Sequence, residues 1–190
     1  GVVDGAVAAV QQMRASPNFA GSGVLQRAKA VVIVPRSLKV AALVGGAGGH
    51  AVLLARTAHG WSGPAFYTVA SGSLGPQIGV RESTIVLLLM TDRALDAFLH
   101  NNNVTLGASA NLTVAQYSAS GAAAIGSQDV VVWTDSQGLF VGGSVAAQGF
   151  SQDGTLDQAY YGFSGQNMTA TEILAGASHN PGADRLKAVL

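Results

Sequence analysis

The stretch Ile85-Val-Leu-Leu-Leu-Met-Thr-Asp-Arg-Ala-Leu-Asp-Ala-Phe98 places a short apolar run directly before the start of a helix. The run has strand length, whereas a helix that spans a membrane needs roughly 18 apolar residues. Thr91 and Asp92 are residue types that cap the first turn of a helix, which predicts a helix from Arg93 to Leu99. The centre of the chain is therefore predicted to be a strand followed at once by a helix.

The segments around this stretch are short, β-rich and separated by glycine. We predict strands at 30–34, 40–44, 51–55, 65–70, 77–80, 84–90, 104–110, 112–115, 130–134 and 139–147. Glycine accounts for 25 of the 190 residues, about twice its usual share. This composition favours turns and closely packed strands over a helical bundle.

Helical patterns mark both ends of the chain. Apolar residues recur at helical spacing from Val3 to Met13, which predicts an amphipathic helix, and a second short helix is expected over 24–29. Near the other end, Thr169 with an acid three residues later forms a capping box for a helix over 170–175. Asn180-Pro181 can begin a last helix that reaches the end of the chain.

We therefore predict one α+β domain, 1–190, with a glycine-rich, mainly antiparallel β-sheet or barrel-like body and helices at both ends. Its parts are a helical segment 1–29, a β-rich body 30–165 with a helix near 92–100, and C-terminal helices 169–190. Residues of the apolar class make up 48% of the chain and charged residues 11%, so a sizeable core can form. A length of 190 residues fits a single domain.

Charge is divided unevenly along a chain whose formal net charge is zero. No acid occurs from Gly5 to Arg81, a stretch with seven bases, whereas Glu82 to Leu190 has nine acids and three bases. A surface of one sign attracts partners of the opposite sign. The first half thus favours an anionic partner: a phospholipid head group, a nucleic acid or an acidic protein surface.

The glycine-rich motif Gly46-Ala-Gly-Gly-His-Ala51 matches the GxGxxA fingerprint of dinucleotide sites only in part. That fingerprint requires a helix directly afterwards and an acid about 20 residues further on. A short apolar run follows instead, and no acid occurs before Glu82. Gly142-Gly-Ser-Val-Ala146 resembles a nucleophile elbow but lacks its final glycine. We interpret the glycines in both places as parts of a sheet.

The remaining polar residues favour no enzyme. The four histidines lack the spacing of metal ligands, and Asp92 and Asp96 are explained by a helix cap and a solvated face. The chain has no cysteine, which excludes disulfides and thiolate chemistry. Its aromatic residues do not alternate with bases as in a nucleic-acid stacking platform. We expect a non-enzymatic protein without metal or cofactor, and no nucleic-acid partner.

Several stretches, in this order, resemble the SYLF domain family, a phosphoinositide-binding module of actin-patch proteins that also occurs in bacterial lipoproteins. The stretch quoted first carries the resemblance most specifically. The others are Ala28–Pro35, Val44–Arg56, Gly60–Tyr67, Gly75–Gly79, Thr105–Ala110, Gly138–Gly142 and Tyr160-Tyr-Gly162. Together they extend over nearly the whole chain.

The resemblance implies binding to anionic phospholipid at a membrane surface through the basic N-terminal part. The residues it assigns to lipid binding are Arg27, Lys29, Arg36, Lys39 and Arg56. His50 stands where the family often has lysine, so its protonation would make it a pH-dependent contributor. Actin binding belongs to eukaryotic members of the family and is not extended to this chain.

Two further expectations concern the setting. The chain opens in what looks like the middle of a helix, and we expect a signal or lipidated leader upstream and a place in the bacterial cell envelope, periplasmic or lipid-anchored. The alternative function is a structural or protein-interaction domain of that envelope with no specific lipid ligand. Any protein partner is unknown.

Overall fold

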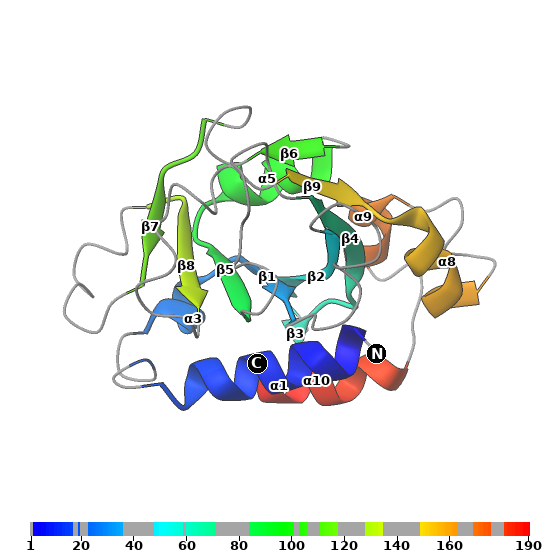
Figure 1. Cartoon of the computed structure of the whole chain (residues 1–190), viewed down its shortest axis with the longest axis horizontal. Helices are drawn as coiled ribbons and strands as arrows, with labels where there is room; N and C mark the ends of the chain where they lie inside the picture. The colour runs from blue at the N-terminus through cyan, green and yellow to red at the C-terminus, as the bar shows by residue number, and fades with distance from the viewer. Residues whose placement is uncertain are drawn as a thin grey trace.

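The computed structural model describes residues 2–16, 19, 23–35, 48–58, 60–70, 84–100, 103–105, 111–117, 128–134, 149–162, 169–175 and 181–190. In this part of the chain a curved β-sheet lies between two sets of helices (Figure 1). Helices α1 (Val2–Arg14) and α10 (Asp184–Val189) lie side by side against one face of the sheet. Helices α5 (Asp92–His100) and α9 (Ala170–Leu174) pack against the other face.

The remaining elements complete this arrangement. The strands are β1 (Ala30–Val34), β2 (Gly48–Thr57), β3 (Gly60–Trp61), β4 (Ala65–Ala70), β5 (Ile85–Leu89), β6 (Asn103–Thr105), β7 (Val114–Gln116), β8 (Val130–Thr134) and β9 (Gly149–Gln152). The other helices are α3 (Val24–Arg27), α8 (Gly154–Tyr161) and the 3-10 turn η2 (Pro181–Ala183). No helix in these described ranges is long and apolar enough to cross a bilayer.

The sheet follows the order β6-β9-β4-β2-β1-β5-β8-β7, with β3 paired to β2. Every pair is antiparallel except β7 with β8. At the centre, Val32 of β1 lies opposite Leu53 on one side and Leu87 on the other. Within the described residues the end strands β6 and β7 do not pair with each other, so the sheet is open. The predicted α+β class is confirmed, with an open sheet rather than a barrel.

Both faces of the central strands are buried. Val32 and Val34 of β1 belong to the core under α5 and α9, whereas Val31 and Ile33 belong to the core under α1 and α10. Successive residues of a strand point to opposite faces, so a strand covered on both sides is apolar throughout. This explains the uninterrupted apolar runs in the sequence.

Helix α1 packs closely on the sheet through one apolar stripe. Its buried residues are Ala6, Val7, Ala9, Val10 and Met13, which agrees with the predicted amphipathic helix. Gly5 faces the residue after β1, because a Cβ on Gly5 would lie 2.8 Å from the Cβ of Pro35. A larger residue at position 5 would push the helix away from the sheet.

The predicted segments agree with most of the described elements, with some corrections. The capping box of Thr169 and Glu172 is present and begins α9. The sequence predicts no helix between about 147 and 169, yet α8 lies there, with its start fixed by Asp153, whose side chain accepts from the amide of Leu156. Helix α10 begins at Asp184, after η2. The strands predicted at 40–44, 77–80 and 139–147 lie outside the described residues.

Candidate functional site

Three of the predicted lipid-binding bases meet at one end of the sheet. Arg27 is the last residue of α3, Lys29 directly precedes β1, and Arg56 lies near the end of β2. The backbone amide of Arg56 donates a 2.9 Å hydrogen bond to the carbonyl oxygen of Lys29, because β2 pairs with β1 in this register. All three residues are exposed. We call Arg27, Lys29 and Arg56 the base cluster.

Within the base cluster, Arg56 also holds the backbone in place. Its Nε donates to the carbonyl oxygen of Ala28 at 3.1 Å and its Nη2 to that of Leu25 at 2.7 Å. Leu25 belongs to α3 and Ala28 is its C-cap, and the carbonyl of Leu25 also accepts from the backbone amide of Ala28 at 3.2 Å. The guanidinium also lies 4.5 Å from the ring centroid of Trp61, its cross-strand neighbour. Arg56 therefore fixes the end of α3 against β2.

Lys29 has a weaker and more exposed partner. Its Nζ lies 3.6 Å from Oδ1 of Asp92 at the start of α5, and the two side chains are 48% and 80% exposed. An ion pair this exposed contributes little stability. The ammonium group of Lys29 can therefore exchange Asp92 for a phosphate at little cost.

Of the other predicted site residues, His50 is described and does not join the base cluster. His50 lies six residues before Arg56 on β2, roughly 20 Å away along the strand. Its Nδ1 is 3.8 Å from Oδ2 of Asp153, the residue that caps α8. Arg36 and Lys39 lie outside the described residues.

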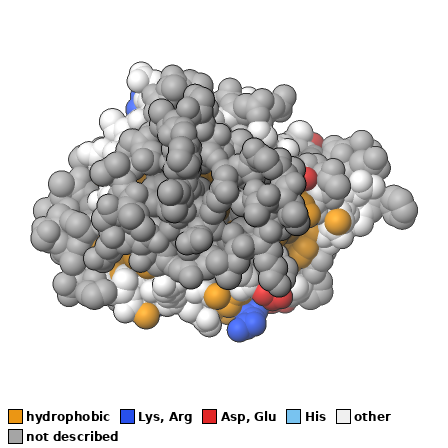
Figure 2. Space-filling model, viewed as in Figure 1, with side chains coloured by type: hydrophobic (Ala, Val, Ile, Leu, Met, Phe, Trp, Pro, Cys, Tyr) orange, Lys and Arg blue, Asp and Glu red, His pale blue; other side chains and the backbone are white. Residues whose placement is uncertain are grey.

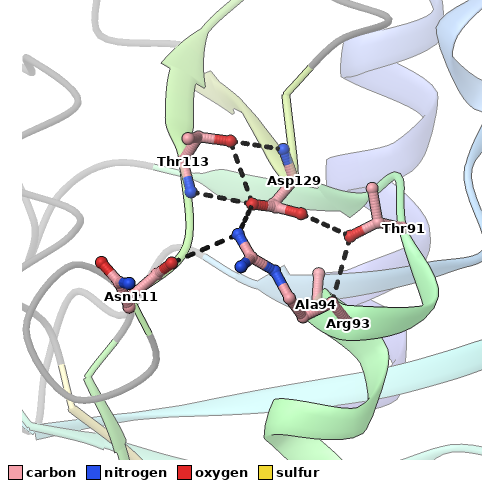
Figure 3. Close-up of polar contacts among 6 residues, drawn as sticks. All are labelled: Thr91, Arg93, Ala94, Asn111, Thr113 and Asp129. Atoms are coloured by element: carbon pink, nitrogen blue, oxygen red, sulfur yellow. Dashed lines mark hydrogen bonds and ion pairs between the residues drawn. The ribbon is translucent and has the colours of Figure 1, made fainter.

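A second polar cluster surrounds Asp129 (Figure 3). Its carboxylate accepts hydrogen bonds from Arg93 Nη2 at 2.6 Å and Thr91 Oγ1 at 2.7 Å, and from the backbone amide and Oγ1 of Thr113, both at 3.0 Å. Burial alone would raise the pKa of Asp129, but these bonds outweigh it and hold that pKa well below its usual range. The cluster joins the start of α5 to β7 and β8, and we interpret it as structural.

The third polar feature is Asp157, an acid of α8 with no exposed surface. Its Oδ1 accepts from the backbone amide of Phe66 at 2.8 Å, and its Oδ2 from Nε2 of Gln152 at 3.3 Å. Burial raises the pKa of Asp157 to about 6, with a smaller increase from Asp153, while the two hydrogen bonds lower it. No sequence pattern marks this residue, since one acid in a short helix carries no signal of burial.

The enzyme-like motifs gain no support where the structure describes them. Gly48 and Gly49 belong to β2, which continues to Thr57, so no helix follows the glycines as a dinucleotide site requires. Among the described residues, no group of three or more His, Cys, Asp or Glu side chains could hold a metal ion. Ser144, at the centre of the elbow-like motif, lies outside them.

The described fold is that of an α+β module with an open sheet, and comparison with known proteins identifies its family. Residues 70–190 match the Ysc84 family, described as "Las17-binding protein actin regulator". The chain belongs to this family, which confirms the resemblance to SYLF domains. Family membership supports a coarse role in membrane or protein interaction.

Curated relatives extend the match toward the N-terminus. LAS seventeen-binding protein 3 of Saccharomyces cerevisiae is 31% identical over 166 residues, 84% of this chain and 35% of that protein. Protein YSC84 of the same yeast is 30% identical over 174 residues, 88% of this chain and 36% of that protein. The human SH3 domain-containing YSC84-like protein 1 is 32% identical over 164 residues, which are 83% of this chain and 46% of that protein.

The chain thus spans less than half the length of these relatives. All three are eukaryotic; the name of the first describes a binding protein and that of the third a protein that contains an SH3 domain. They lend no support to the expected bacterial, lipoprotein and periplasmic setting, which stays a prediction.

Proposed function

We propose that this chain is a non-enzymatic module that binds the anionic surface of a phospholipid membrane through the base cluster. Arg36 and Lys39 belong to the same proposal. The observation that supports it best is the strand pairing that puts Arg56 beside Lys29, 27 residues apart in sequence, next to Arg27. Peripheral membrane binding, in the envelope of a bacterium, is the setting we propose.

The strength of such binding follows from the charges. Each Lys or Arg near an anionic membrane contributes about 1 kcal/mol, so three bases contribute about 3 kcal/mol at low salt. Exposed charges are screened beyond about 8 Å at physiological ionic strength. Binding should therefore rise with the anionic lipid fraction and fall steeply as salt is added.

Liposome co-sedimentation at low and high salt tests this proposal. Vesicles of phosphatidylcholine alone are compared with vesicles that also contain phosphatidylserine or a phosphoinositide. The double variant Lys29→Glu with Lys39→Glu should abolish binding to the anionic vesicles, because it reverses two charges of the proposed surface. The matched control, Arg185→Glu with Lys187→Glu on α10, makes the same charge change elsewhere and should sediment far more like the unmodified chain.

Equal sedimentation by the two double variants would contradict the assignment of the surface. If sedimentation of the unmodified chain depended neither on salt concentration nor on the anionic lipid fraction, the proposed binding to anionic membranes would be contradicted.

A second candidate function is binding to a protein partner, favoured by the printed description of the family and the name of the yeast relative. Under this alternative the bases only keep the surface soluble, and the liposome assay shows no lipid dependence. Chemical crosslinking would then yield a defined complex whose formation does not require vesicles.

A further inference from the structure

An apolar pocket lies where the start of α1 meets α8 and the turn before α10. Its volume is about 360 Å³, and its wall includes the apolar side chains of Val2, Val3, Phe66, Leu156 and Tyr160. Hydrophobic side chains gather on the right of the face in Figure 2, between the positions that α8 and the N-terminus have in Figure 1. The pocket shares no residue with the base cluster, so it is a separate feature of the surface.

The wall of the pocket is aromatic on one side. The rings of Phe66 and Tyr160, which both belong to the wall, lie 5.1 Å apart at 60°. Tyr161 lies behind the wall and packs edge-on against Tyr160 at 5.0 Å. Such rings offer an apolar surface together with the negative face that attracts a cation. A ligand with both an apolar and a cationic group would use both properties.

Two acidic residues, Asp4 and Asp184, lie close to the pocket. Asp4 forms part of its wall. The pKa of Tyr160 is raised by burial and, beyond that, by the negative charges of Asp184 and Asp4. These two carboxylates are therefore close enough to act on the Tyr160 hydroxyl, and both residues are exposed. A cation at the mouth would be attracted, whereas a phosphate would be repelled.

We propose that this pocket binds a segment of a partner protein in which an apolar side chain is flanked by lysine or arginine. A volume of 360 Å³ is at the low end of ligand pockets and suits one or two side chains. The acidic rim pairs with the flanking bases and disfavours the acyl chain of an anionic lipid, whose head group would lie against Asp4. The proposal is independent of membrane binding by the base cluster.

Titration of the ¹⁵N-labelled chain, followed by two-dimensional NMR, tests the proposal with three capped peptides. GKFKG carries both recognised features, GEFEG reverses the charges, and GKAKG removes the apolar ring. GKFKG should shift the amides of Val3, Leu156 and Tyr160 in a saturable way with a Kd of about 1 mM, a range that this method measures. GEFEG and GKAKG should bind about tenfold more weakly or not at all.

Two variants connect the binding to the pocket. Ala159→Leu narrows the pocket from an exposed position of its wall and should weaken GKFKG about tenfold. Asp4→Asn should weaken it about threefold, the contribution of one exposed ion pair. Ala8→Leu, at an exposed position of α1 outside the pocket wall, is the matched control and should bind as the unmodified chain does.

Several results would overturn the proposal. One is the absence of saturable shifts with GKFKG at about ten times the expected Kd. Another is equal binding of GKFKG and GEFEG, and a third is binding that Ala159→Leu leaves unchanged while the spectrum shows a folded protein. Saturable shifts of the same amides with monomeric decanoate, tighter than with GKFKG, would assign the pocket to an acyl chain instead.

Discussion

At the scale of single residues, the most unusual group is the carboxyl of Asp157. It is completely buried, yet it bonds to the backbone amide of Phe66 and to the side chain of Gln152. A buried, hydrogen-bonded carboxyl costs the fold little stability while it is protonated and neutral, but its ionisation in a buried position costs more. This makes the stability of the fold sensitive to pH.

The direction of that sensitivity follows from the pKa. The pKa of Asp157 is about 6 in the folded chain against an ordinary 3.8, so the folded state binds the proton more tightly. The contribution of this bound proton to the free energy of unfolding is complete below pH 3.8 and is lost as pH rises through 6. Ionised Asp157 should then lower the free energy of unfolding on the order of 2 kcal/mol at neutral pH.

Asp157→Asn should remove this dependence. The amide keeps an acceptor for Phe66, and Gln152 can turn its own amide to accept from the new one. We expect the variant to match the unmodified chain near pH 4 and to be more stable above pH 7, as measured by urea unfolding across pH. Asp96→Asn, on the exposed side of α5, is the control and should leave the profile unchanged. A variant that is less stable at every pH would contradict the raised pKa.

Asp129 should make the stability of the fold depend on pH in the opposite direction. Its pKa is lowered in the folded chain, because its hydrogen bonds outweigh its burial, so its contribution is present above the ordinary pKa and is lost as the solution becomes acidic. Asp129→Asn should cost about 1–3 kcal/mol at pH 7, since Arg93 and Thr113 lose a charged acceptor. Urea unfolding at pH 7 and pH 3 checks this. The loss should be smaller at the lower pH, and an equal loss at both would count against it.

At the scale of elements, Arg56 serves both the fold and the proposed surface, and one substitution separates the two roles. Arg56→Lys keeps the charge but loses the two-pronged contact with Leu25 and Ala28 and the stacking on Trp61. We expect it to lower stability by about 1–2 kcal/mol while anionic liposomes still bind the folded protein.

The matched control is Arg27→Lys in α3, which should change stability little, because the Nε bond of Arg27 to the carbonyl of Gly23 is long, at 3.3 Å, and exposed. Thermal unfolding followed by circular dichroism compares the two variants. Equal stabilities would show that Arg56 does not fix α3.

The elements that the sequence predicts well are those with a continuous apolar run or a local cap. Strands β1, β5 and β8 are buried along their whole length, and α9 has its complete capping box. Strand β9 is Gly-Phe-Ser-Gln and has one apolar residue, Phe150, so its place depends on pairing with β4. Tertiary pairing of this kind leaves no local pattern.

The candidate site likewise has a part that the sequence predicts and a part that depends on tertiary pairing. Arg27 and Lys29 are neighbours in sequence, so their closeness was predictable. That Arg56 joins them, and that His50 does not, depends on the register of β2 against β1. The double role of Arg56 follows from the position of α3, which no sequence pattern indicates.

At the scale of the whole molecule, the two ends of the chain form one layer. Leu186 of α10 is fully buried in the core that α1 covers, and Nη1 of Arg14 donates to the carbonyl oxygen of Val189 at 2.8 Å. Both helices run in the same direction beneath the sheet (Figure 1). The stability of the first helix is therefore coupled to that of the last.

Leu186→Ala should reveal this coupling. The loss of a fully buried leucine side chain costs about 2–5 kcal/mol. We expect hydrogen exchange of the amides in α1 to accelerate together with those in α10, while β1 and β5 change less. Val189→Ala removes a half-buried side chain from the same helix and should have a smaller effect. Exchange that accelerates in α10 alone would contradict the coupling.

The contact between α1 and α10 can form only late during synthesis of the chain. Arg14 and Val189 are 175 residues apart, so the first helix emerges from the ribosome long before its neighbour exists. At about 5–20 residues per second, the gap is on the order of 10 s or longer. During that interval the side of α1 that α10 will cover stays open to chaperones and to neighbouring nascent chains. Residues 184–189 thus complete a layer that residues 2–14 began.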